Sequence, residues 1–402
     1  MNSGQWQQAA RSVLAGLDGS HLYRRRRLIV PLDAAHVQWE GRHYVNFASN
    51  NYLGLAQDPR VVRAAAQTLD RDGAGSAASP LICGYGPAHA NAERHIASWK
   101  GTEACVLLPS GYQANHAAIQ TLAAVALACG KGVRFLLDKL CHASLIDAVR
   151  GSGAPFRIFP HNHMGKLGRL LDESPPGKLQ AVVTDSIFSM DGDPADLPAI
   201  ARLKQKHPFV LLLDEAHATG VYGPCGSGLA AELALGDVVD VTVVTLSKAI
   251  GSAGGAVCAS ATFCEALVNL ARAYVYSTSV APAAAAAADA AISIMESEPQ
   301  RQQRVRQLAR QTREELRRSG HTIPAGDSPI IPLILGSETA ALQAADYLMA
   351  RGVFVLAIRP PTVPRGSSRL RITLSSQHTD AEVESLIRMI GELKTCATGY
   401  GR

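Results

Sequence analysis

Short apolar runs that alternate with helical stretches constrain the fold of this 402-residue chain more than any other feature of its sequence. The alternation extends from Asn50 to about Ala281. Uninterrupted apolar runs are typical of parallel strands, because helices cover such strands on both faces of the sheet. The pattern therefore predicts an α/β fold with a large, doubly wound and mostly parallel central sheet over residues 50–281.

The segments on either side of this region predict two further parts. Residues 1–49 predict an N-terminal arm, formed by a helix and short strands around residues 37–47. The alanine-rich stretch 281–291 predicts a long helix, because alanine is the best helix former. A smaller α/β C-terminal domain is expected over residues 282–402, with helices at 302–318, 340–350 and 380–393 and strands at 330–335, 353–358 and 370–373.

The composition is typical of an ordinary globular protein, with 47% hydrophobic and 18% charged residues. The net charge of +5 is mild and spread along the chain, so we expect no nucleic-acid partner. No apolar stretch reaches the ~20 residues of a membrane span, and the first residues lack the pattern of a signal peptide. The eight cysteines have neither CxxC nor zinc spacing, so we expect no metal site. Scattered thiols fit a cytoplasmic protein.

Polar residues follow several of the apolar runs. Asp214 ends the run 209–213, and the run 238–245 leads into Lys248. Ligands of open α/β sheets bind beyond the carboxyl ends of the strands, so these two side chains share a crevice if their strands are neighbours. Such a pair suits pyridoxal 5′-phosphate (PLP), which needs a Schiff-base lysine and an aspartate that keeps its ring nitrogen protonated. The two residues alone leave a buried ion pair as an equal alternative.

Two other run ends carry residues that suit the same cofactor. His142 follows the run 133–137, and a planar imidazole can stack on a pyridine ring. Gly111 and Tyr112 follow the run 104–108 at the start of a predicted helix, where free N–H groups suit a phosphate. A packing histidine and a plain strand-to-helix turn are the structural alternatives.

A rival motif is the sequence Gly-Ser-Gly-Leu-Ala-Ala at 226–231, which satisfies a loose dinucleotide-binding pattern. That pattern requires a strand directly before it and an acidic residue ~20 positions later. Here a turn-rich segment, residues 219–225, precedes the glycines, and the acidic residue is missing. We interpret residues 226–231 as a loop and not as the nucleotide site of a dehydrogenase.

Seven sequence blocks stand out along the chain, at residues 46–55, 110–115, 142–144, 188–193, 214–217, 276–279 and 358–364. In this order they resemble the blocks of the α-oxoamine synthases, which are PLP-dependent transferases of fold type I, the aspartate-aminotransferase fold. The most discriminating block, residues 358–364, is more similar to the oxononanoate-forming branch than to the branches that use glycine or serine. Two positions depart from the family pattern: Asp185-Ser186 replaces glutamate and glycine, and Asn51 replaces aspartate. Neither removes a group that the reaction needs.

The resemblance implies a role for each matching residue. Lys248 would hold the cofactor and act as the base at Cα, Asp214 would pair with the ring nitrogen, and His142 would stack on the ring. The other cofactor-binding residues would be Gly111, Tyr112, Ser189, His217 and Thr245, with Ser277 and Thr278 reaching the cofactor phosphate of a partner subunit. Substrate would contact Arg24, Asn50, Arg359 and Thr362.

The activity implied is the decarboxylative condensation of L-alanine with a pimeloyl thioester of coenzyme A or acyl carrier protein. The products would be 8-amino-7-oxononanoate, carbon dioxide and a free thiol, in biotin biosynthesis, and the enzyme would be a homodimer with active sites at its interface. A sister synthase that joins glycine or serine to another acyl-CoA, such as 2-amino-3-ketobutyrate CoA ligase, stays an alternative, as does a non-catalytic relative. Arg24 lies in a run of four arginines, which more often forms a solvated face.

Overall fold

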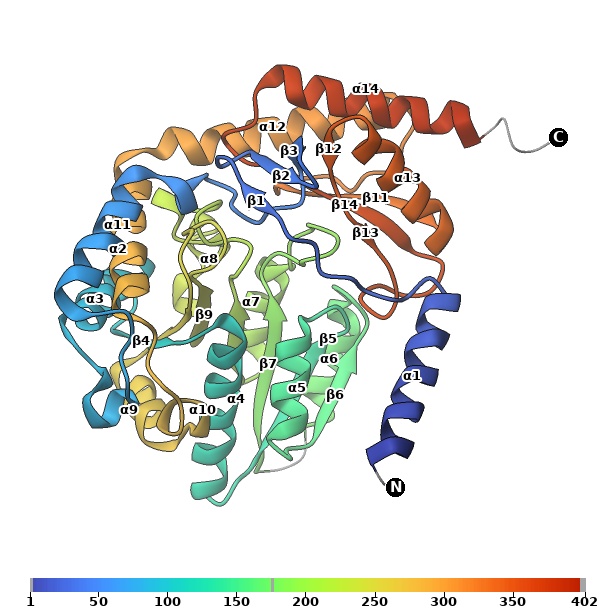
Figure 1. The fold of residues 1–402 in the computed structure, drawn as a ribbon. Helices are drawn as coiled ribbons and strands as arrows, with labels where there is room; N and C mark the ends of the chain where they lie inside the picture. Colours follow the sequence, from blue (N-terminus) through green and yellow to red (C-terminus); the bar gives the residue numbers. More distant parts are fainter. Residues whose placement is uncertain (1–2, 175–176, 398–402) are drawn as a thin grey trace. The chain divides into compact units, whose positions relative to one another are not determined.

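A computed structural model describes residues 3–174 and 177–397 of the chain, and these residues form two compact units (Figure 1). The first unit spans residues 1–49 and 308–402, and the second spans residues 50–307. Residues 282–307 group with the second unit, whereas the sequence analysis assigned them to the C-terminal domain. The domain limits of 1–49, 50–281 and 282–402 stay a prediction. No helix of the described residues is long and apolar enough for a membrane crossing.

A seven-stranded sheet forms the centre of the second unit. Strand β10 runs antiparallel to both of its neighbours, β4 and β9, and the remaining pairs are parallel. The prediction of a mostly parallel sheet is therefore confirmed. The strands, in spatial order, are β4 (Ala104–Leu108), β10 (Gly255–Ala259), β9 (Val241–Thr245), β8 (Val210–Asp214), β7 (Leu179–Asp185), β5 (Val133–Asp138) and β6 (Phe156–Phe159).

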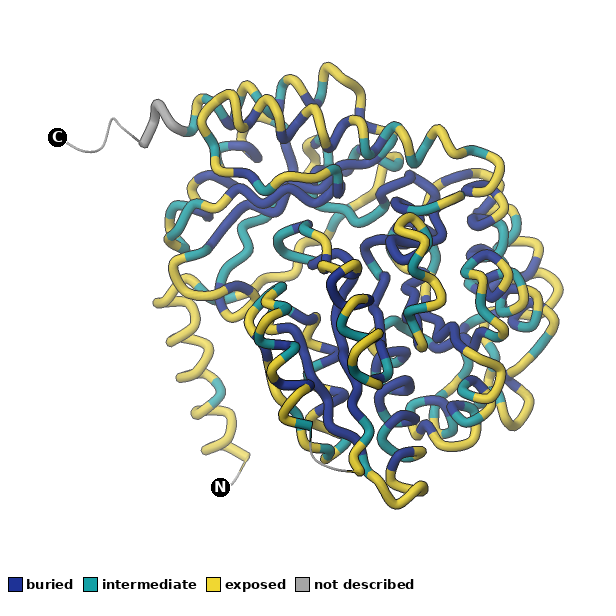
Figure 2. The backbone as a smooth tube through the Cα atoms, turned by 180° about the vertical axis from the view of Figure 1, so that it is seen from behind, coloured by how far each residue is buried: buried dark blue, intermediate teal, exposed yellow. Residues whose placement is uncertain are grey.

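Helices cover both faces of this sheet. Every residue of β5, β9 and β10 is buried, and Figure 2 shows buried backbone at the centre of this unit. Because successive side chains of a strand point to opposite faces, both faces of the sheet must be covered. Helix α4 packs across β4, β5, β9 and β10, and its fully buried alanines at 114, 117 and 118 allow a close approach. The helices of this unit are α2 (Pro59–Asp72), α3 (Pro87–Lys100), α4 (Gly111–Ala128), α5 (Ala143–Gly151), α6 (Met164–Asp172), α7 (Leu197–Lys206), α8 (Leu229–Glu232), α9 (Ala261–Leu270), α10 (Arg272–Val275) and α11 (Pro282–Ser297).

The first unit is built on two small sheets. One has the order β1 (Val30–Pro31), β2 (His36–Trp39), β3 (Arg42–Asn46) and β12 (Val353–Phe354), and the other has the order β11 (Ile330–Gly336), β14 (Ser368–Thr373) and β13 (Ala357–Ile358). Val37, Tyr44, Met349 and Phe354 form a common apolar cluster. The helices of this unit are α1 (Ser3–Gly19), α13 (Glu338–Ala350) and α14 (Asp380–Ala397), and α12 (Pro299–Arg318) continues into it from the second unit.

Two predicted strands have different limits in the structure. Residues 236–238 form a 3-10 turn, and β9 therefore begins only at Val241. The residue before the strand, Asp240, accepts the N–H of Leu211 with its carboxylate at 2.6 Å. Residues 353–358 divide into β12, which pairs with β3, and β13, which pairs with β14. The division arises because the chain passes from one small sheet to the other between these strands.

The loose dinucleotide pattern at residues 226–231 lies outside any strand-to-helix turn. Gly226 ends a 3-10 turn, and Leu229 begins the four-residue helix α8. The interpretation of residues 226–231 as a loop is therefore wrong for residues 229–231, which belong to α8. No strand directly precedes the segment, as a nucleotide-binding fingerprint would require.

His161 joins three loops at the carboxyl edge of the sheet. Its Nδ1 lies 3.0 Å from Asp138 Oδ1 at the end of β5, and its Nε2 lies 2.7 Å from Asp193 Oδ2 in the loop after β7. Burial alone would lower the pKa of His161, but hydrogen bonds to the two carboxylates raise this pKa to about 10. The imidazole is therefore a cation at neutral pH, and it ties the loop after β6 to the loops after β5 and β7.

We expect His161→Gln to lower the free energy of unfolding most at acidic to neutral pH. The pKa of histidine is about 6.5 in an unfolded chain, so the stabilisation is complete below that pH and is lost as pH rises through about 10. At pH 6 the cost should be about 2 kcal/mol, less than for a fully buried pair, because the side chain is 25% exposed. Urea unfolding of both proteins at pH 6 and pH 10 measures the difference; an equal cost at both pH values would contradict the prediction.

Candidate active site

The carboxyl edge of the large sheet surrounds a cavity of about 180 Å³ in the second unit. Loops after five strands contribute its walls, as expected for an open α/β sheet. The cavity brings together seven of the predicted cofactor residues: Gly111, Tyr112, His142, Asp214, His217, Thr245 and Lys248. Its other lining residues are Ser110, Asn115, Ser144, Asp185, Ala216, Val243 and Ser247.

Asp214 is held in one orientation at the end of β8. Its Oδ1 accepts the N–H of Ala216 at 2.8 Å, and its Oδ2 accepts the side-chain amide of Asn115 at 2.7 Å. The same amide nitrogen donates to Ser144 Oγ at 2.8 Å. Asp214 is 4% exposed, so these bonds fix a buried carboxylate at the wall of the cavity. Asn115 lies in the block 110–115 but has no predicted role.

Asp185 is a second buried carboxyl group of the cavity, and it stands opposite Asp214 in the β7–β8 register. Its Oδ2 accepts the backbone N–H of His142 at 2.9 Å. Burial raises the pKa of Asp185, and the nearby Asp214 raises it further. Ser186 then bonds the Asp214 carbonyl through its N–H at 2.8 Å and its hydroxyl at 3.1 Å. Asp185 and Ser186, which replace the glutamate and glycine of the family pattern, thus hold the backbone at two predicted site residues, His142 and Asp214.

His142 forms the N-cap of α5. Its Nδ1 lies 2.7 Å from Ser144 Oγ, and its side chain also accepts the N–H of Ser144. Burial lowers the pKa of His142, and the Lys248 ammonium adds to that effect against the opposing influence of Asp214. The imidazole is therefore neutral at pH 7 and has a fixed orientation.

The first turn of α4 offers an anion site at the cavity. Ser110 caps the helix by accepting the N–H of Gln113 at 3.1 Å, and the free N–H groups of a helix start favour a phosphate. A Cβ atom at Gly111 would lie 3.1 Å from Thr245 Oγ1, and one at Gly255 would lie 2.6 Å from the Gly111 nitrogen. These two glycines therefore allow α4, β9 and β10 to approach closely. Thr245 Oγ1 also lies 3.0 Å from Ser247 Oγ.

Lys248 lies in a bend that follows β9. Its carbonyl accepts the N–H of Gly251 at 2.9 Å, and Gly251 has a left-handed φ of 74°. The side chain is partly buried and lines the cavity. Strands β8 and β9 are paired neighbours, which meets the condition for a shared crevice. Asp214 and Lys248 both line the cavity, so the two side chains share one crevice.

Four other predicted residues of this unit are not among the residues that line the cavity: Asn50, Ser189, Ser277 and Thr278. The hydroxyl of Tyr52 lies 2.6 Å from His217 Nδ1 and 3.4 Å from Asn50 Oδ1. Ser277 Oγ accepts the side-chain amide of Gln113 at 3.1 Å, beside the first turn of α4. Ser189 and Thr278 lie in the loops after β7 and α10, respectively, and their roles stay predictions.

Three predicted substrate residues gather in the first unit. Arg24 Nη2 donates to Thr362 Oγ1 at 3.3 Å, and Arg359 donates to the carbonyls of His21 and Tyr23. Burial lowers the pKa of Arg359, and the neighbouring guanidinium groups of Arg24 and Arg27 lower it further. This concentration of positive charge suits an anionic ligand. Of the run Arg24–Arg27, Arg24 makes the contact with Thr362.

Comparisons with known proteins agree with this geometry. The aminotransferase class I and II family matches residues 42–390. The 8-amino-7-oxononanoate synthase of Stutzerimonas stutzeri (strain A1501) is 41% identical over 382 residues, which cover 95% of each chain.

Solved structures share the fold over most of the chain. A serine palmitoyltransferase from S. paucimobilis, solved with a bound PLP–myriocin aldimine, has a TM-score of 0.90 at 26% identity and covers 98% of this chain and 99% of its own. The 8-amino-7-oxononanoate synthase of Francisella tularensis has a TM-score of 0.76 at 25% identity and covers 88% and 99%. The chain therefore belongs to the aminotransferase class I and II family, in the group that contains the 8-amino-7-oxononanoate synthases.

Proposed function

We propose that this protein is a PLP-dependent acyltransferase, an 8-amino-7-oxononanoate synthase of biotin biosynthesis. It condenses L-alanine with a pimeloyl thioester and releases carbon dioxide, a free thiol and 8-amino-7-oxononanoate. The observation that carries this proposal is the meeting of Lys248, Asp214 and the first turn of α4 in one cavity. The chain that holds them is 41% identical to a curated synthase of that name.

The residues of the cavity fit PLP. Lys248 supplies an amine for the aldehyde, Asp214 a fixed carboxylate for the ring nitrogen, and His142 a neutral planar ring that can stack on the pyridine. Gly111 leaves the start of α4 free of a side chain where a phosphate would bind. Tyr112 and Thr245 line this phosphate end, and we assign the phenolic oxygen of the cofactor to Ser189 and His217.

The roles of the catalytic residues follow from their chemistry. When bound, PLP supplies an electron sink that stabilises negative charge on the amino-acid Cα. Asp214 would keep the ring nitrogen protonated and thereby strengthen that sink. Lys248 would hold the cofactor, and its free amine would take the proton from the Cα of bound L-alanine. His142, which is neutral, donates a hydrogen bond toward the carbonyl of the thioester and so favours attack on it.

The substrate contacts are proposals as well. We assign the carboxylate of L-alanine to Asn50 and Arg359, and the acyl substrate to Arg24 and Thr362. An arginine binds a carboxylate or a phosphate with paired N–H donors, so Arg24 suits either end of a pimeloyl thioester of coenzyme A or acyl carrier protein. Its contact with Thr362 supports placing the two residues in one site.

Substrate preference tests the proposed function. Purified protein loaded with PLP should turn over L-alanine with pimeloyl-CoA or pimeloyl-acyl carrier protein at least about tenfold faster, in kcat/KM, than glycine or serine with shorter or longer acyl-CoA thioesters. Thiol release and detection of the amino ketone measure each pair. A preference for glycine with acetyl-CoA would instead establish a sister synthase, and the absence of turnover with every pair would establish a non-catalytic relative.

Lys248→Ala should fold normally but lose the borohydride-reducible link between protein and cofactor. Because this variant lacks both the covalent anchor and the base at Cα, turnover should fall by about 10³-fold or more. Lys139→Ala is the matched control, since Lys139 is exposed in the loop that leads to His142. Visible absorbance, borohydride trapping and circular dichroism provide the measurements. Native absorbance and native turnover in Lys248→Ala would refute the assignment.

We also propose a cytoplasmic homodimer with active sites at the subunit interface. In such a dimer Ser277 and Thr278 would reach the cofactor phosphate of a partner subunit; within its own chain, Ser277 Oγ accepts the side-chain amide of Gln113. The cysteines at 83, 105, 129, 141, 225, 258 and 264 are free thiols, which fits a reducing compartment. Cys396 has a side chain outside the described part of the chain.

Dilution tests the dimer. If each active site needs groups from two subunits, specific activity should fall when the protein is diluted below its dissociation constant, because the monomer lacks a complete site. Sedimentation velocity at the same concentrations reports the assembly state. Full specific activity in a solution of monomers would contradict an interfacial active site.

A further inference from the structure

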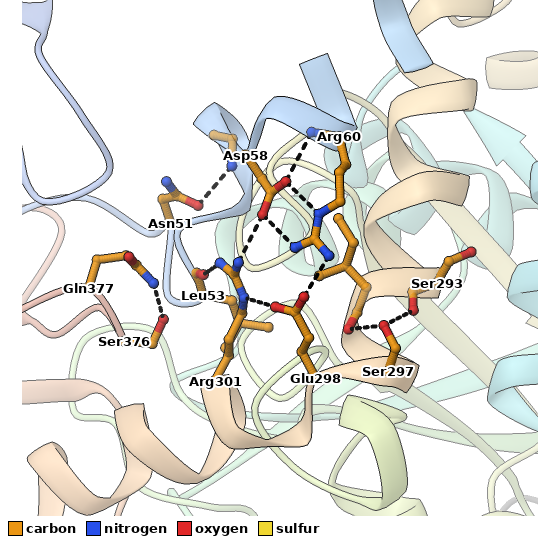
Figure 3. Close-up of polar contacts among 12 residues, drawn as sticks. Asn51, Leu53, Asp58, Arg60, Ser293, Ser297, Glu298, Arg301, Ser376 and Gln377 are labelled. Carbon is orange, nitrogen blue, oxygen red and sulfur yellow. Dashed lines mark hydrogen bonds and ion pairs between the residues drawn. The ribbon is translucent and has the colours of Figure 1, made fainter. Parts of the chain in front are cut away.

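Four charged residues of the second unit form a closed network beside the loop that carries Asn51 and Leu53 (Figure 3). Arg60 donates to both carboxyl oxygens of Asp58 at 3.0 and 2.9 Å and to Glu298 Oε1 at 2.5 Å. Arg301 donates to Asp58 Oδ2 at 2.8 Å and to Glu298 Oε2 at 2.7 Å. Both arginines therefore pair with the same two carboxylates.

The two arginines differ in one contact. Arg301 also donates from Nη1 to the backbone carbonyl of Leu53 at 3.0 Å, whereas the side-chain hydrogen bonds of Arg60 all go to Asp58 and Glu298 within the described residues. The Arg301 side chain is 19% exposed, compared with 47% for Arg60. Arg301 is thus the more buried member and the one that holds the chain at Leu53.

The loop that Arg301 holds, residues 50–56, contacts two parts of the candidate site: His217 and the turn that contains Lys248. The Tyr52 hydroxyl lies 2.6 Å from Nδ1 of His217. A Cβ atom at Gly251 would lie 2.4 Å from the nitrogen of Ala56, so the loop backbone packs directly on the turn that Gly251 closes by its bond to the Lys248 carbonyl. Tyr52, Leu53 and Leu55 are at most 1% exposed. A displacement of this loop would therefore reach both His217 and the Lys248 turn.

We infer that Arg301 is a positioning residue, which fixes the loop Asn50–Ala56 against the Lys248 turn and His217. The importance of this for turnover rests on the proposed function, which gives Lys248 and His217 their roles. An arginine suits the task because its planar group carries N–H donors in several directions, and here it serves Asp58, Glu298 and the Leu53 carbonyl at once. A lysine is a point charge and cannot span the three acceptors equally well.

The network stays charged over the working pH range. Hydrogen bonds from Arg60 lower the pKa of Asp58 to about 2, in spite of its burial, and hydrogen bonds from Arg60 and Arg301 lower the pKa of Glu298. Asp58 also caps α2 by accepting the N–H of Arg60. The contact of Arg301 with Leu53 is therefore anchored to the start of a helix and to a carboxylate that does not titrate near neutral pH.

The pair Arg301→Gln and Arg60→Gln tests the inference, because each variant removes one arginine from the same two carboxylates. Both should lower the melting temperature. Arg301→Gln alone should speed hydrogen exchange of the backbone amides in residues 50–57 of the cofactor-free protein, weaken PLP binding in an absorbance titration, and lower kcat by about tenfold or more. Arg60→Gln should stay within about twofold of the parent protein in these three measurements. Arg301→Lys should give intermediate values.

Two results would overturn the inference. Equal effects of Arg301→Gln and Arg60→Gln on exchange and on PLP binding would mean that the network contributes only stability. Unchanged exchange in residues 50–57 of Arg301→Gln, or of Arg301→Lys if the glutamine variant does not fold, would mean that Arg301 does not hold the loop. Hydrogen exchange does not depend on which amino acid or thioester is used. A failure of the proposed substrate preference would therefore leave this contrast between the variants measurable.

Discussion

The parallel pairing of β8 with β9 is the constraint on which the candidate site depends. Asp214 pairs with Val243 in this register, so β8 ends at the edge of the sheet from which β9 leads into the Lys248 bend. A shift of one residue would turn the Asp214 side chain to the opposite face of the sheet. The antiparallel strand β10 adds the second requirement, because Gly255 lets its backbone lie against Gly111 at the start of α4. Carboxylate, amine and helix start thereby meet in one cavity.

The sequence was sufficient to predict the strands that are buried on both faces. Strands β4, β5 and β8 are buried and consist mainly of apolar residues, and their predicted limits agree with the structure within a residue or two. The polar residue directly after such a run identified Asp214, and His142 was found a few positions beyond the end of another run. The same rule applies to Asp185, which ends β7 and lines the cavity, so a more complete use of it would have found this residue too.

Contacts between loops could not be predicted, because no local period encodes them. His161 binds carboxylates 23 and 32 positions away, and Arg301 binds Asp58 across 243 positions. The limits of short strands were also beyond the sequence, since β12 and β13 are separated by a change of sheet rather than by a break in hydrophobicity. The roles of Arg24, Arg359 and Thr362 came only from the resemblance to a family, although the structure groups these residues in one unit.

His161, with its partners Asp138 and Asp193, and Arg301, with its partners Asp58 and Glu298, both fix loops at the edge of the large sheet. Loops at the edge of a sheet have no ladder of backbone hydrogen bonds, so other groups must fix their position. Apolar packing is non-directional, and replacing a buried ion pair by apolar side chains is often neutral for stability. Charged side chains instead donate directional bonds to a defined atom, as Arg301 does to the Leu53 carbonyl. We therefore attribute these partly buried charges to the precision with which they hold the loops, more than to the free energy of folding that they contribute.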